Sequence, residues 1–366
     1  MEKVRLGDVC KKATSNIAQK DLEGHHGKFP VFGASGHIAD VEFYQQDKPY
    51  IAVVKDGAGV GRVMKLPAKS SIIGTLQYIL PNDMIDSDYL MFAMENMNLA
   101  KYYSGATIPH IYFKDYQNEK IYLPEMDKQR EIARVINRVN CLIELRKQQL
   151  EKLDLLVKAR FVEMFGTYPA NEYKWETRTI RDIVTDVRYG SSRKASDSGN
   201  GKYQYLRMNN ITYSGELDLS EIKTIDIPDK ELPKCTVKKG DILFNRTNSK
   251  ELVGKTCVYN RDEIMVLAGF IIRVRVNDKV LPEFVSTFLN TDFSKCMLYN
   301  MCKAAIGQAN INAQEMQSIG IFLPPIELQE KFVHFKTQVV RSKSEIQKGL
   351  EKTEWLKSAL MQKYFE

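Results

Sequence analysis

"IYLPEMDKQREI", residues 121–132, returns in the second half of the chain as "IFLPPIELQEKF", residues 321–332. The start moves from 121 to 321, an offset of 200 residues, and the same offset still relates Phe165 to Phe365. A register held over this length indicates two copies of one structural unit. The order of elements deduced for one copy therefore applies to the other.

The offset shrinks toward the front of each copy. "VGRV" (60–63) matches "VGKT" (253–256) at 193 residues, and "LGDV" (6–9) matches "IRDI" (180–183) at 174 residues. Insertions therefore lie in the front part of the second copy, while the rear part keeps its length. This difference indicates two separate roles within each unit.

The rear part of each copy has the spacing of a long helix. Apolar residues recur at steps of three and four, which predicts helices of about 55 Å at ~1.5 Å per residue. We expect the two helices to pack as an antiparallel coiled coil; the alternative is that each packs only on its own domain. The apolar positions are Ile132, Ile136, Val139, Ile143, Leu150, Leu153, Val157 and Met164 in the first copy, and Phe332, Val339, Ile346, Leu350, Leu356 and Leu360 in the second.

The front parts are predicted to be mostly β. Short runs rich in β-branched and aromatic residues alternate with Gly, Asn, Asp and Pro, and a short helix follows at Asp88–Met97 and again at Pro282–Leu289. The predicted fold class is α+β, with two tandem β-rich domains that are each followed by a long helix. The expected boundaries are 1–125 for the first domain, 126–166 for its helix, 167–174 for a linker, 175–325 for the second domain and 326–366 for the second helix.

The stretch "VVKDGAGVGRVMK" (53–65) resembles a nucleotide-binding loop when it is considered alone. A dinucleotide fingerprint needs GxGxxG opening a helix, but here the spacing is GxGxG and a strand-like segment follows. The equivalent "NRTNSKELVGKT" (245–256) has Lys250 where a Walker loop needs glycine. We therefore predict a β-hairpin turn in both copies.

The front parts are rich in side chains that donate hydrogen bonds. Such side chains grip phosphates and read base edges in DNA, although a solvated hairpin would have a similar composition. His110 and Asn310 occupy equivalent positions in the two copies. The candidate DNA contacts are Lys55, Arg62, Thr75, Gln77, His110, Arg188, Tyr189, Ser191, Ser192, Arg193, Lys194, Arg207, Asn209, Asn210, Arg246, Thr247, Asn248, Ser249, Lys250, Gln308 and Asn310.

Composition narrows the possible functions. The 366 residues carry a formal charge of +7, which suits a polyanionic partner without requiring one. Six scattered cysteines and five histidines show no metal-ligand spacing, and no known catalytic motif is complete. No apolar run reaches the ~20 residues of a membrane span, and no signal-type segment opens the chain. We expect a cytoplasmic protein without a catalytic or metal site.

Taken together, these motifs resemble the DNA-specificity subunit of type I restriction-modification systems over essentially the whole chain. The resemblance rests on "MEKVRLGDV" (1–9) and "WETRTIRDI" (175–183), on "VVKDGAGVG" (53–61) and "KGDILFNRTNSKELVGKT" (239–256), and on the two segments that enter the helices. One departure is that the first copy lacks a counterpart of Trp175.

The resemblance implies that the front parts and the long helices have different roles. Each front part would be a target recognition domain that reads one half of a split, asymmetric site in double-stranded DNA. The helices would set the unread gap and dock two modification subunits, which use S-adenosylmethionine to methylate adenine. Restriction-translocase subunits that use ATP and magnesium would complete the complex, and this chain would itself be neither an enzyme nor a cofactor-binding protein.

Two other classes of function stay open at this point. The first is a nucleotide-dependent enzyme that uses the 57–62 glycine loop, in which case ATP or a dinucleotide would raise the melting temperature. The second is a purely structural coiled-coil adaptor, whose activity would survive deletion of both front parts.

Overall fold

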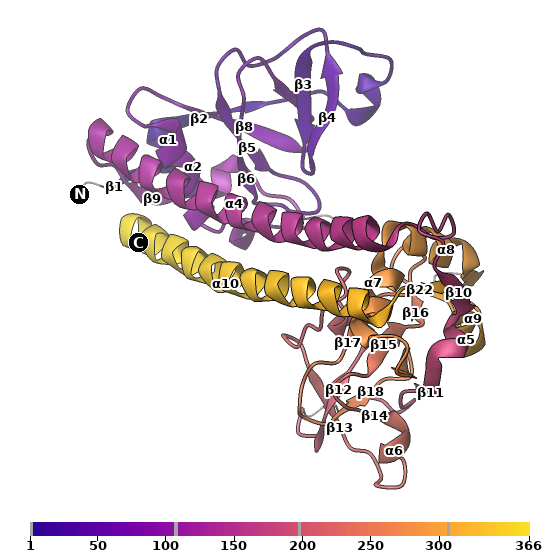
Figure 1. Cartoon of the computed structure of the whole chain (residues 1–366). Coiled ribbons are helices and arrows are strands. Elements are labelled where there is room, and N and C mark those ends of the chain that lie inside the picture. Colours follow the sequence, from indigo (N-terminus) through magenta and orange to yellow (C-terminus); the bar gives the residue numbers. More distant parts are fainter. Residues whose placement is uncertain (1–2, 106–108, 197–198, 306–307) are drawn as a thin grey trace. The chain divides into compact units, whose positions relative to one another are not determined.

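A computed structural model describes residues 3–105, 109–196, 199–305 and 308–366 (Figure 1). The chain forms two compact units, one made of Met1–Lys147 with Lys348–Glu366 and the other of Gln148–Gln347. Both units mix helices and strands, as predicted for an α+β protein. Each long helix contributes residues to both units.

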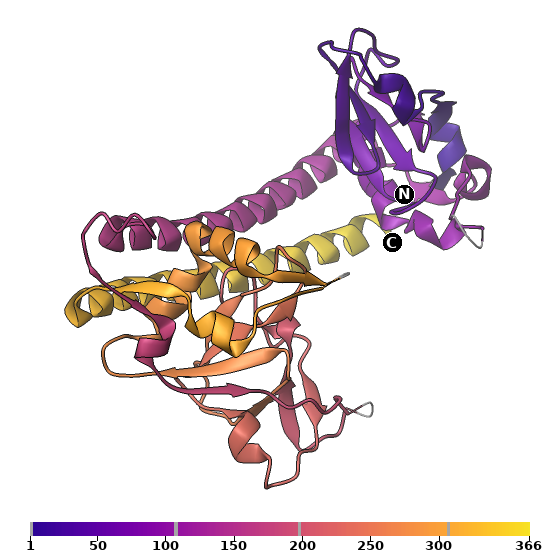
Figure 2. The ribbon, with the colours of Figure 1, turned by 90° about the vertical axis from the view of Figure 1, so that its right-hand side faces the viewer.

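The first unit is built on an antiparallel sheet in the order β2-β8-β5-β6. Its central strand β5 is buried along its whole length, as its unbroken apolar sequence requires. Figure 2 shows these strands, in indigo and violet, beside the first turns of α4. The four strands are β2 (Cys10–Thr14), β8 (Leu76–Pro81), β5 (Tyr50–Val54) and β6 (Val63–Leu66).

Smaller elements complete the first unit. Strands β4 (Gly36–Val41), β3 (Phe29–Gly33) and β7 (Ser71–Ile72) form a second sheet, and β1 (Lys3–Arg5) pairs with β9 (Lys120–Tyr122). The helices are α1 (Leu6–Val9), α2 (Ser87–Asn96), α3 (Phe113–Tyr116) and the 3-10 turns η1 (Gln19–Leu22) and η2 (Leu99–Tyr102). The short helix expected at residues 88–97 is confirmed as α2.

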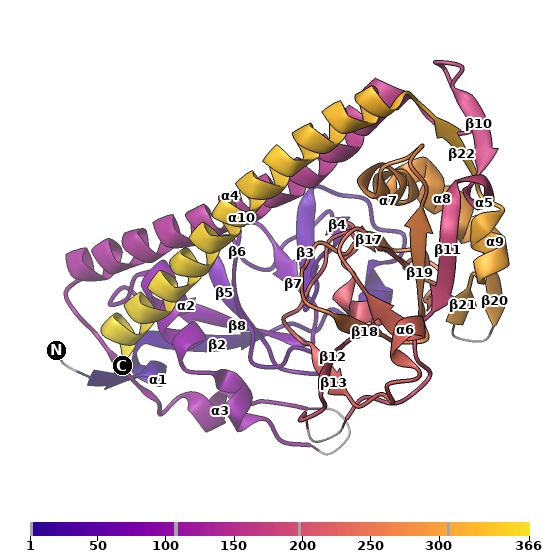
Figure 3. The same cartoon turned by 60° about the horizontal axis from the view of Figure 1, so that its bottom comes forward.

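The second unit repeats this plan. Its main sheet has the order β11-β19-β15-β17, and β11 and β19 lie side by side in Figure 3. These strands are β11 (Val184–Tyr189), β19 (Ile271–Val276), β15 (Ile242–Asn245) and β17 (Thr256–Val258). The second expected short helix is confirmed as α7 (Pro282–Asn290).

The remaining elements of the second unit include its insertions. A sheet of order β13-β12-β18-β14 contains Lys223–Ile225, Tyr203–Leu206, Met265–Leu267 and Thr236–Val237, and β10 (Glu176–Thr179) pairs with β22 (Gly320–Leu323). Strands β16 (Thr247–Asn248), β21 (Gln308–Asn310) and β20 (Lys303–Ala305) form a third sheet. The helices are α5 (Ile180–Ile183), η3 (Met208–Asn210), α6 (Leu232–Cys235), α8 (Asp292–Met301) and α9 (Ala313–Gln317).

The two long helices are α4 (Met126–Phe165) and α10 (Ile326–Phe365), each of 40 residues. In the first unit, Ile132 and Ile136 of α4 lie in the same apolar core as Met361 of α10. Gly349 of α10 has no side chain, and the guanidinium of Arg146 lies in the space that a methyl group would need. Ile132 and Ile136, which belong to the apolar stripe predicted from the sequence, therefore face the core of the first unit.

In the second unit the helices meet through aromatic rings. Phe161 and Phe165 of α4 are fully buried, and their ring centroids lie 5.3 and 5.6 Å from that of Phe332 on α10. Lys343 of α10 donates to Asp154 of α4 over 2.5 Å. Fully burying side chains of this size contributes about 2–3 kcal/mol each, so aromatic packing dominates this contact.

The recurring glutamine that opens each long helix has a structural role. Gln129 is 1% exposed, and its Oε1 accepts a hydrogen bond from the Asp86 amide over 2.8 Å. Its Nε2 donates to the carbonyl oxygens of Met84 and Pro124 over 3.1 and 2.8 Å. One side chain thus joins the start of α4 to the segment that precedes α2.

Gln329 repeats these bonds in the second unit. It is fully buried, its Oε1 accepts from the Leu281 amide over 2.9 Å, and its Nε2 donates to the carbonyl oxygens of Lys279 and Pro324 over 3.2 and 2.9 Å. Because buried backbone groups need hydrogen-bond partners, the glutamine satisfies groups that the turn before α7 leaves unpaired.

Candidate nucleic-acid interface

The glycine-rich stretch of the first unit is the turn of the β5–β6 hairpin. The Val54 amide donates to the Arg62 carbonyl over 2.9 Å, and the Gly61 amide donates to the Val54 carbonyl over 2.8 Å. Gly57, Gly59 and Gly61 have φ angles of 83°, 83° and 86°, which favour glycine. The hairpin prediction is confirmed, so no helix N-terminus follows the loop to bind a phosphate.

Gly61 also allows two chain segments to approach closely. A Cβ atom at this position would lie 2.5 Å from the amide nitrogen of Ala100. Gly61 therefore serves both the turn and the contact with η2.

The second unit has the same hairpin between β15 and β17. The Gly254 amide donates to the Asn245 carbonyl over 2.8 Å, and the Asn245 amide donates to the Lys255 carbonyl over 2.8 Å. Gly254 has a φ angle of 77°. The loops differ in their side chains but keep the hydrogen bonds that close them.

Lys295 of α8 supports the second hairpin, a role that no motif of the sequence indicated. Its Nζ donates to the Gly254 carbonyl over 2.8 Å. Burial, and then the charges of Lys158 and Lys255, lowers the pKa of Lys295 to about 7. Near neutral pH the amine is therefore partly uncharged and acts mainly as a hydrogen-bond donor to the loop.

Lys55 and Arg246 occupy the same place in the two units. The Lys55 amide donates to the Thr75 carbonyl and its carbonyl accepts from the Ile111 amide, over 3.0 and 2.9 Å. The Arg246 amide and carbonyl make the same two bonds with Phe270 and Ile311, over 3.0 and 2.9 Å. In each unit the hairpin is therefore joined to the segment that contains His110 or Asn310, which precedes the short helix α3 or α9.

The side chains at this junction differ between the units. In the first unit the His110 Nδ1 lies 2.7 Å from an Asp56 carboxylate oxygen, and the Lys55 Nζ lies 3.6 Å from the other. All three side chains are partly exposed. Asp56 was not among the residues predicted from the sequence, because only hydrogen-bond donors were considered. Its position next to Lys55 in the glycine-rich loop could have identified it.

In the second unit the junction gathers three predicted residues from separate stretches. The guanidinium carbon of Arg246 lies 4.8 Å from the centroid of the Tyr189 ring, and its Nη2 donates to the Asn310 Oδ1 over 3.2 Å. The Tyr189 hydroxyl accepts from the Ala313 amide over 2.9 Å. Residues separated by more than a hundred positions in the sequence thus form one cluster.

Four of the predicted contacts lie inside the fold, and we correct their assignment. Gln77 accepts from the Tyr116 hydroxyl over 3.5 Å, while Asn210 accepts from the Arg207 amide and donates to the Asp218 carbonyl. The side chains of Gln77 and Asn210 therefore bond within the protein, and all four residues are buried. The buried four are Gln77, Ser191, Asn210 and Thr247.

Other arginines that were predicted to contact DNA already form hydrogen bonds within the protein. Arg193 makes two hydrogen bonds to the Glu231 carboxylate, over 3.0 and 2.7 Å, and its hydrogen bond lowers the pKa of that carboxyl. Arg188 bonds to Asp186 over 2.9 Å, and Arg207 to the Glu221 carbonyl over 3.1 Å.

The remaining candidates lie at or near the surface. Asn248 is half-buried and pairs with Ala309 through β16 and β21, and the Lys250 Nζ lies 4.1 Å from the Tyr299 ring centroid. The tips of the loops before the long helices, 106–108 and 306–307, are outside the described residues. The exposed candidates are Arg62, Thr75, Ser192, Lys194, Asn209, Ser249 and Gln308.

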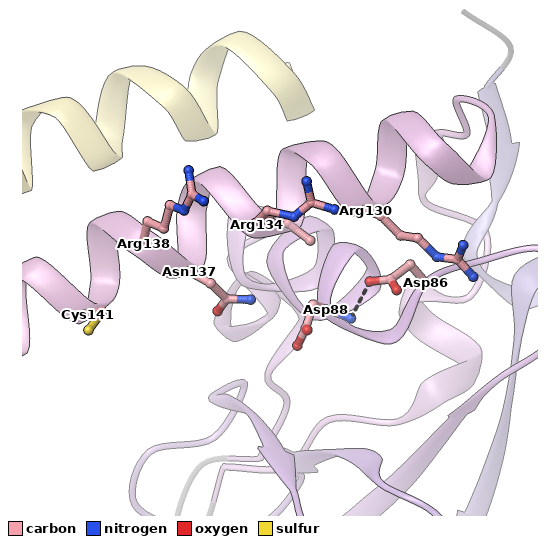
Figure 4. A pocket seen from close by; sticks show the side chains of 8 residues that line it. Asp86, Asp88, Arg130, Arg134, Asn137, Arg138 and Cys141 are labelled. Carbon is pink, nitrogen blue, oxygen red and sulfur yellow. Dashed lines mark hydrogen bonds between the residues drawn. The ribbon is translucent and has the colours of Figure 1, made fainter.

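A stripe of arginines lies on α4 in the first unit (Figure 4). Arg130, Arg134 and Arg138 are four residues apart and therefore share one face of the helix. They line an open hollow of about 510 Å³, together with Asp86 and Asp88. The second copy has glutamate, histidine and glutamine at the equivalent positions 330, 334 and 338, so the arginine stripe is confined to the first copy.

Within the described part of the chain, no three His, Cys, Asp or Glu side chains are grouped so that they could hold a metal ion. The described helices also include none with the length and apolar character needed to cross a membrane.

A known family matches this architecture. The sequence model of the type I restriction modification DNA specificity domain matches residues 1–155 and 172–353. The chain belongs to this family. The two matched ranges correspond to the two copies recognised in the sequence, so the repeat is a repeat of the specificity domain.

Characterised members of the specificity family resemble the chain over most of its length. The EcoKI specificity subunit of Escherichia coli K12 is 22% identical over 313 residues, which cover 80% of this chain and 67% of that protein. The MjaVIII specificity subunit of Methanocaldococcus jannaschii is 24% identical over 364 residues, covering 90% of this chain and 83% of that one.

Solved structures of the specificity family share the fold. The type I restriction-modification S subunit from M. genitalium has a TM-score of 0.61 at 15% identity, covering 100% of this chain and 96% of that one. A chain from a structural study of complex assembly and conformational transition in the type I R-M system has a TM-score of 0.56 at 17% identity, covering 99% and 97%.

Proposed function

We propose that the chain is the sequence-specific DNA-binding subunit of a type I restriction-modification complex. Its domains at 1–125 and 175–325 each read one half of a split, asymmetric site. The observation that carries this proposal is the junction of hairpin and loop, where one backbone frame holds Lys55, Asp56 and His110 in one copy and Tyr189, Arg246 and Asn310 in the other. A constant frame with different side chains suits two different base sequences.

We further propose that the helices at 126–166 and 326–366 form an antiparallel coiled coil that sets the gap between the half-sites. Contacts within each unit support this arrangement. The start of α4 shares a core with the end of α10 in the first unit, and the end of α4 packs on the start of α10 in the second. Such pairing is expected of two antiparallel helices.

The same helices are proposed to dock two modification subunits, and restriction-translocase subunits would join them. Exposed apolar side chains on the helices support a docking role, among them Leu142, Leu145 and Leu155 on α4 and Trp355 on α10, which is 73% exposed. S-adenosylmethionine, ATP and magnesium are assigned to those partners. This chain would recognise the DNA and position the partner subunits, and it would not itself catalyse a reaction.

Footprinting of the chain with its modification subunits tests the proposed function. We expect protection of two short DNA blocks on either side of an unread gap, with affinity that falls steeply as salt rises because phosphate contacts release counterions. Protection without sequence preference would contradict the proposal. Saturating ATP or dinucleotide is expected to leave the melting temperature of the isolated chain unchanged, whereas an increase would favour a nucleotide-dependent enzyme.

Charge reversal on α4 tests the docking surface. Replacing both Arg134 and Arg138 with glutamate is expected to weaken binding of a modification subunit about tenfold at low salt, because exposed charges steer association and suppress mismatched contacts. The matched control introduces glutamate at His334 and Gln338 of the second copy, where a smaller change is expected. Calorimetric titration measures both, and equal losses would show that the arginine stripe has no special role.

A further inference from the structure

Arg246 differs from the other arginines around the second junction because no carboxylate neutralises it. Arg188 and Arg193 bond to Asp186 and Glu231, and on the neighbouring strand β19 Arg273 and Arg275 bond to aspartates as well. Among the described residues, no acidic side chain lies within ion-pair distance of Arg246. Its full positive charge is therefore available to a ligand.

The position of this guanidinium is fixed from several sides. The backbone amide and carbonyl of Arg246 are both bonded, the guanidinium lies over the Tyr189 ring, and Asn310 accepts from Nη2. Tyr189 is itself held by the Ala313 amide. Arginine loses much rotamer freedom when it binds, so a guanidinium that is already held in one plane binds with a smaller entropic cost.

The free donors of Arg246 lie at the end of the side chain. Its Nε is buried and has no hydrogen-bond partner, so it cannot reach a ligand. Among the residues that the structure describes, none bonds to the terminal Nη1, while Nη2 gives one of its two N–H groups to Asn310. The Asn310 amide accepts with its oxygen and is exposed, which leaves its amino group as a neighbouring donor. The free donors of the cluster are therefore the terminal N–H groups of Arg246 and the amino group of Asn310.

A row of donors in a fixed plane selects one base. In the major groove guanine presents two adjacent acceptors, N7 and O6, whereas adenine and cytosine each present an amino donor and thymine a methyl group beside its single acceptor. A phosphate also accepts from a planar guanidinium. The stack on Tyr189 and the bond to Asn310 fix the plane of Arg246, and a fixed plane suits the two in-plane acceptors of a guanine edge.

We infer that Arg246 reads a guanine through N7 and O6 in the half-site bound by the domain at 175–325. This inference rests on the proposed function and assigns a base to it. The equivalent residue of the first unit, Lys55, has an aspartate beside it and lacks the planar guanidinium fork that makes a bidentate contact. The guanine requirement imposed by this junction is therefore confined to one half-site.

The test uses the full chain with its modification subunits. Selection from random duplexes first defines the split site, and 7-deazaguanine, which lacks the N7 acceptor, is then placed at each guanine in turn. We expect one position, in one half-site, where this change weakens binding about tenfold for the wild-type chain. In Arg246→Ala the same change should have no further effect, and the base preference there should relax.

Further variants separate base reading from folding and from charge. Arg246→Lys keeps the charge but loses the fork, so the preference for guanine should fall while the melting temperature stays the same. Tyr189→Phe should keep the preference and Tyr189→Ala should lose it, because the ring holds the plane. Arg193→Ala is the matched control, since its guanidinium is already bound to Glu231, and no change in base preference is expected.

The results distinguish a failure of the proposed function from a failure of the inference about guanine. Wild-type binding without any sequence preference would refute the proposed function and the inference with it. A wild-type chain that selects a split site, while Arg246→Ala weakens binding equally for every sequence and 7-deazaguanine is tolerated throughout, would make Arg246 a phosphate contact. That outcome would overturn the inference and leave the proposed function intact.

Discussion

Replacing Gln329 with leucine is expected to lower the free energy of unfolding by about 3–5 kcal/mol. The substitution removes three hydrogen bonds to backbone groups and leaves the partly buried Leu281 amide without this partner. A lost hydrogen bond costs about 1 kcal/mol and a buried unsatisfied group about 1–3 kcal/mol. Leucine is close in size, so the loss reflects the polar contacts rather than a cavity.

The repeat provides its own replicate of this experiment. Gln129→Leu removes the same three kinds of bond in the first unit, and a similar decrease in stability is expected. Gln149→Leu, on the exposed face of α4, is the control and should change stability by less than about 0.5 kcal/mol. Thermal denaturation followed by circular dichroism compares all three. A Gln329→Leu chain as stable as the control would mean that the turn before α7 finds other partners.

These glutamines show what sequence reasoning can and cannot supply. The recurrence of Gln129 and Gln329 was visible in the sequence, because two copies of one unit retain the residues that the unit needs. Their role was not visible, because the partners are backbone atoms of Asp86 and Leu281, which lie more than forty positions away. Periodicity predicts helices and hairpins, but it does not identify which distant backbone groups lack partners.

The same limit applies to the residues that were predicted for the candidate interface. Donor-rich composition selected Tyr189, Arg246 and Asn310, which the fold brings together. The same criterion also selected Arg193, whose charge Glu231 neutralises, and Asn210, whose side-chain amide bonds to the backbone of Arg207 and Asp218. The type of a residue shows whether its side chain can donate a hydrogen bond. Whether that donor is free to contact DNA depends on its neighbours in the folded chain.

Lengthening both long helices by one heptad is expected to move the chain to a different DNA target. Seven residues, inserted after Lys147 and after the equivalent Gln347 at the boundaries of the two units, add about 10 Å at ~1.5 Å per residue. DNA rises about 3.4 Å per base pair, so the gap between the half-sites should grow by up to about three base pairs. The bases read on each side should stay the same, because neither junction is altered.

Selection from random duplexes, performed with modification subunits, measures this gap directly. A heptad keeps the apolar seam nearly in phase, since a coiled coil repeats every seven residues. Inserting two residues at the same places turns the seam by about 200°, and that control should lower the melting temperature and abolish selective binding. If the heptad variant is as stable as the wild-type chain and still selects the original gap, the helices do not measure the distance between half-sites, and the gap must be set by the partner subunits.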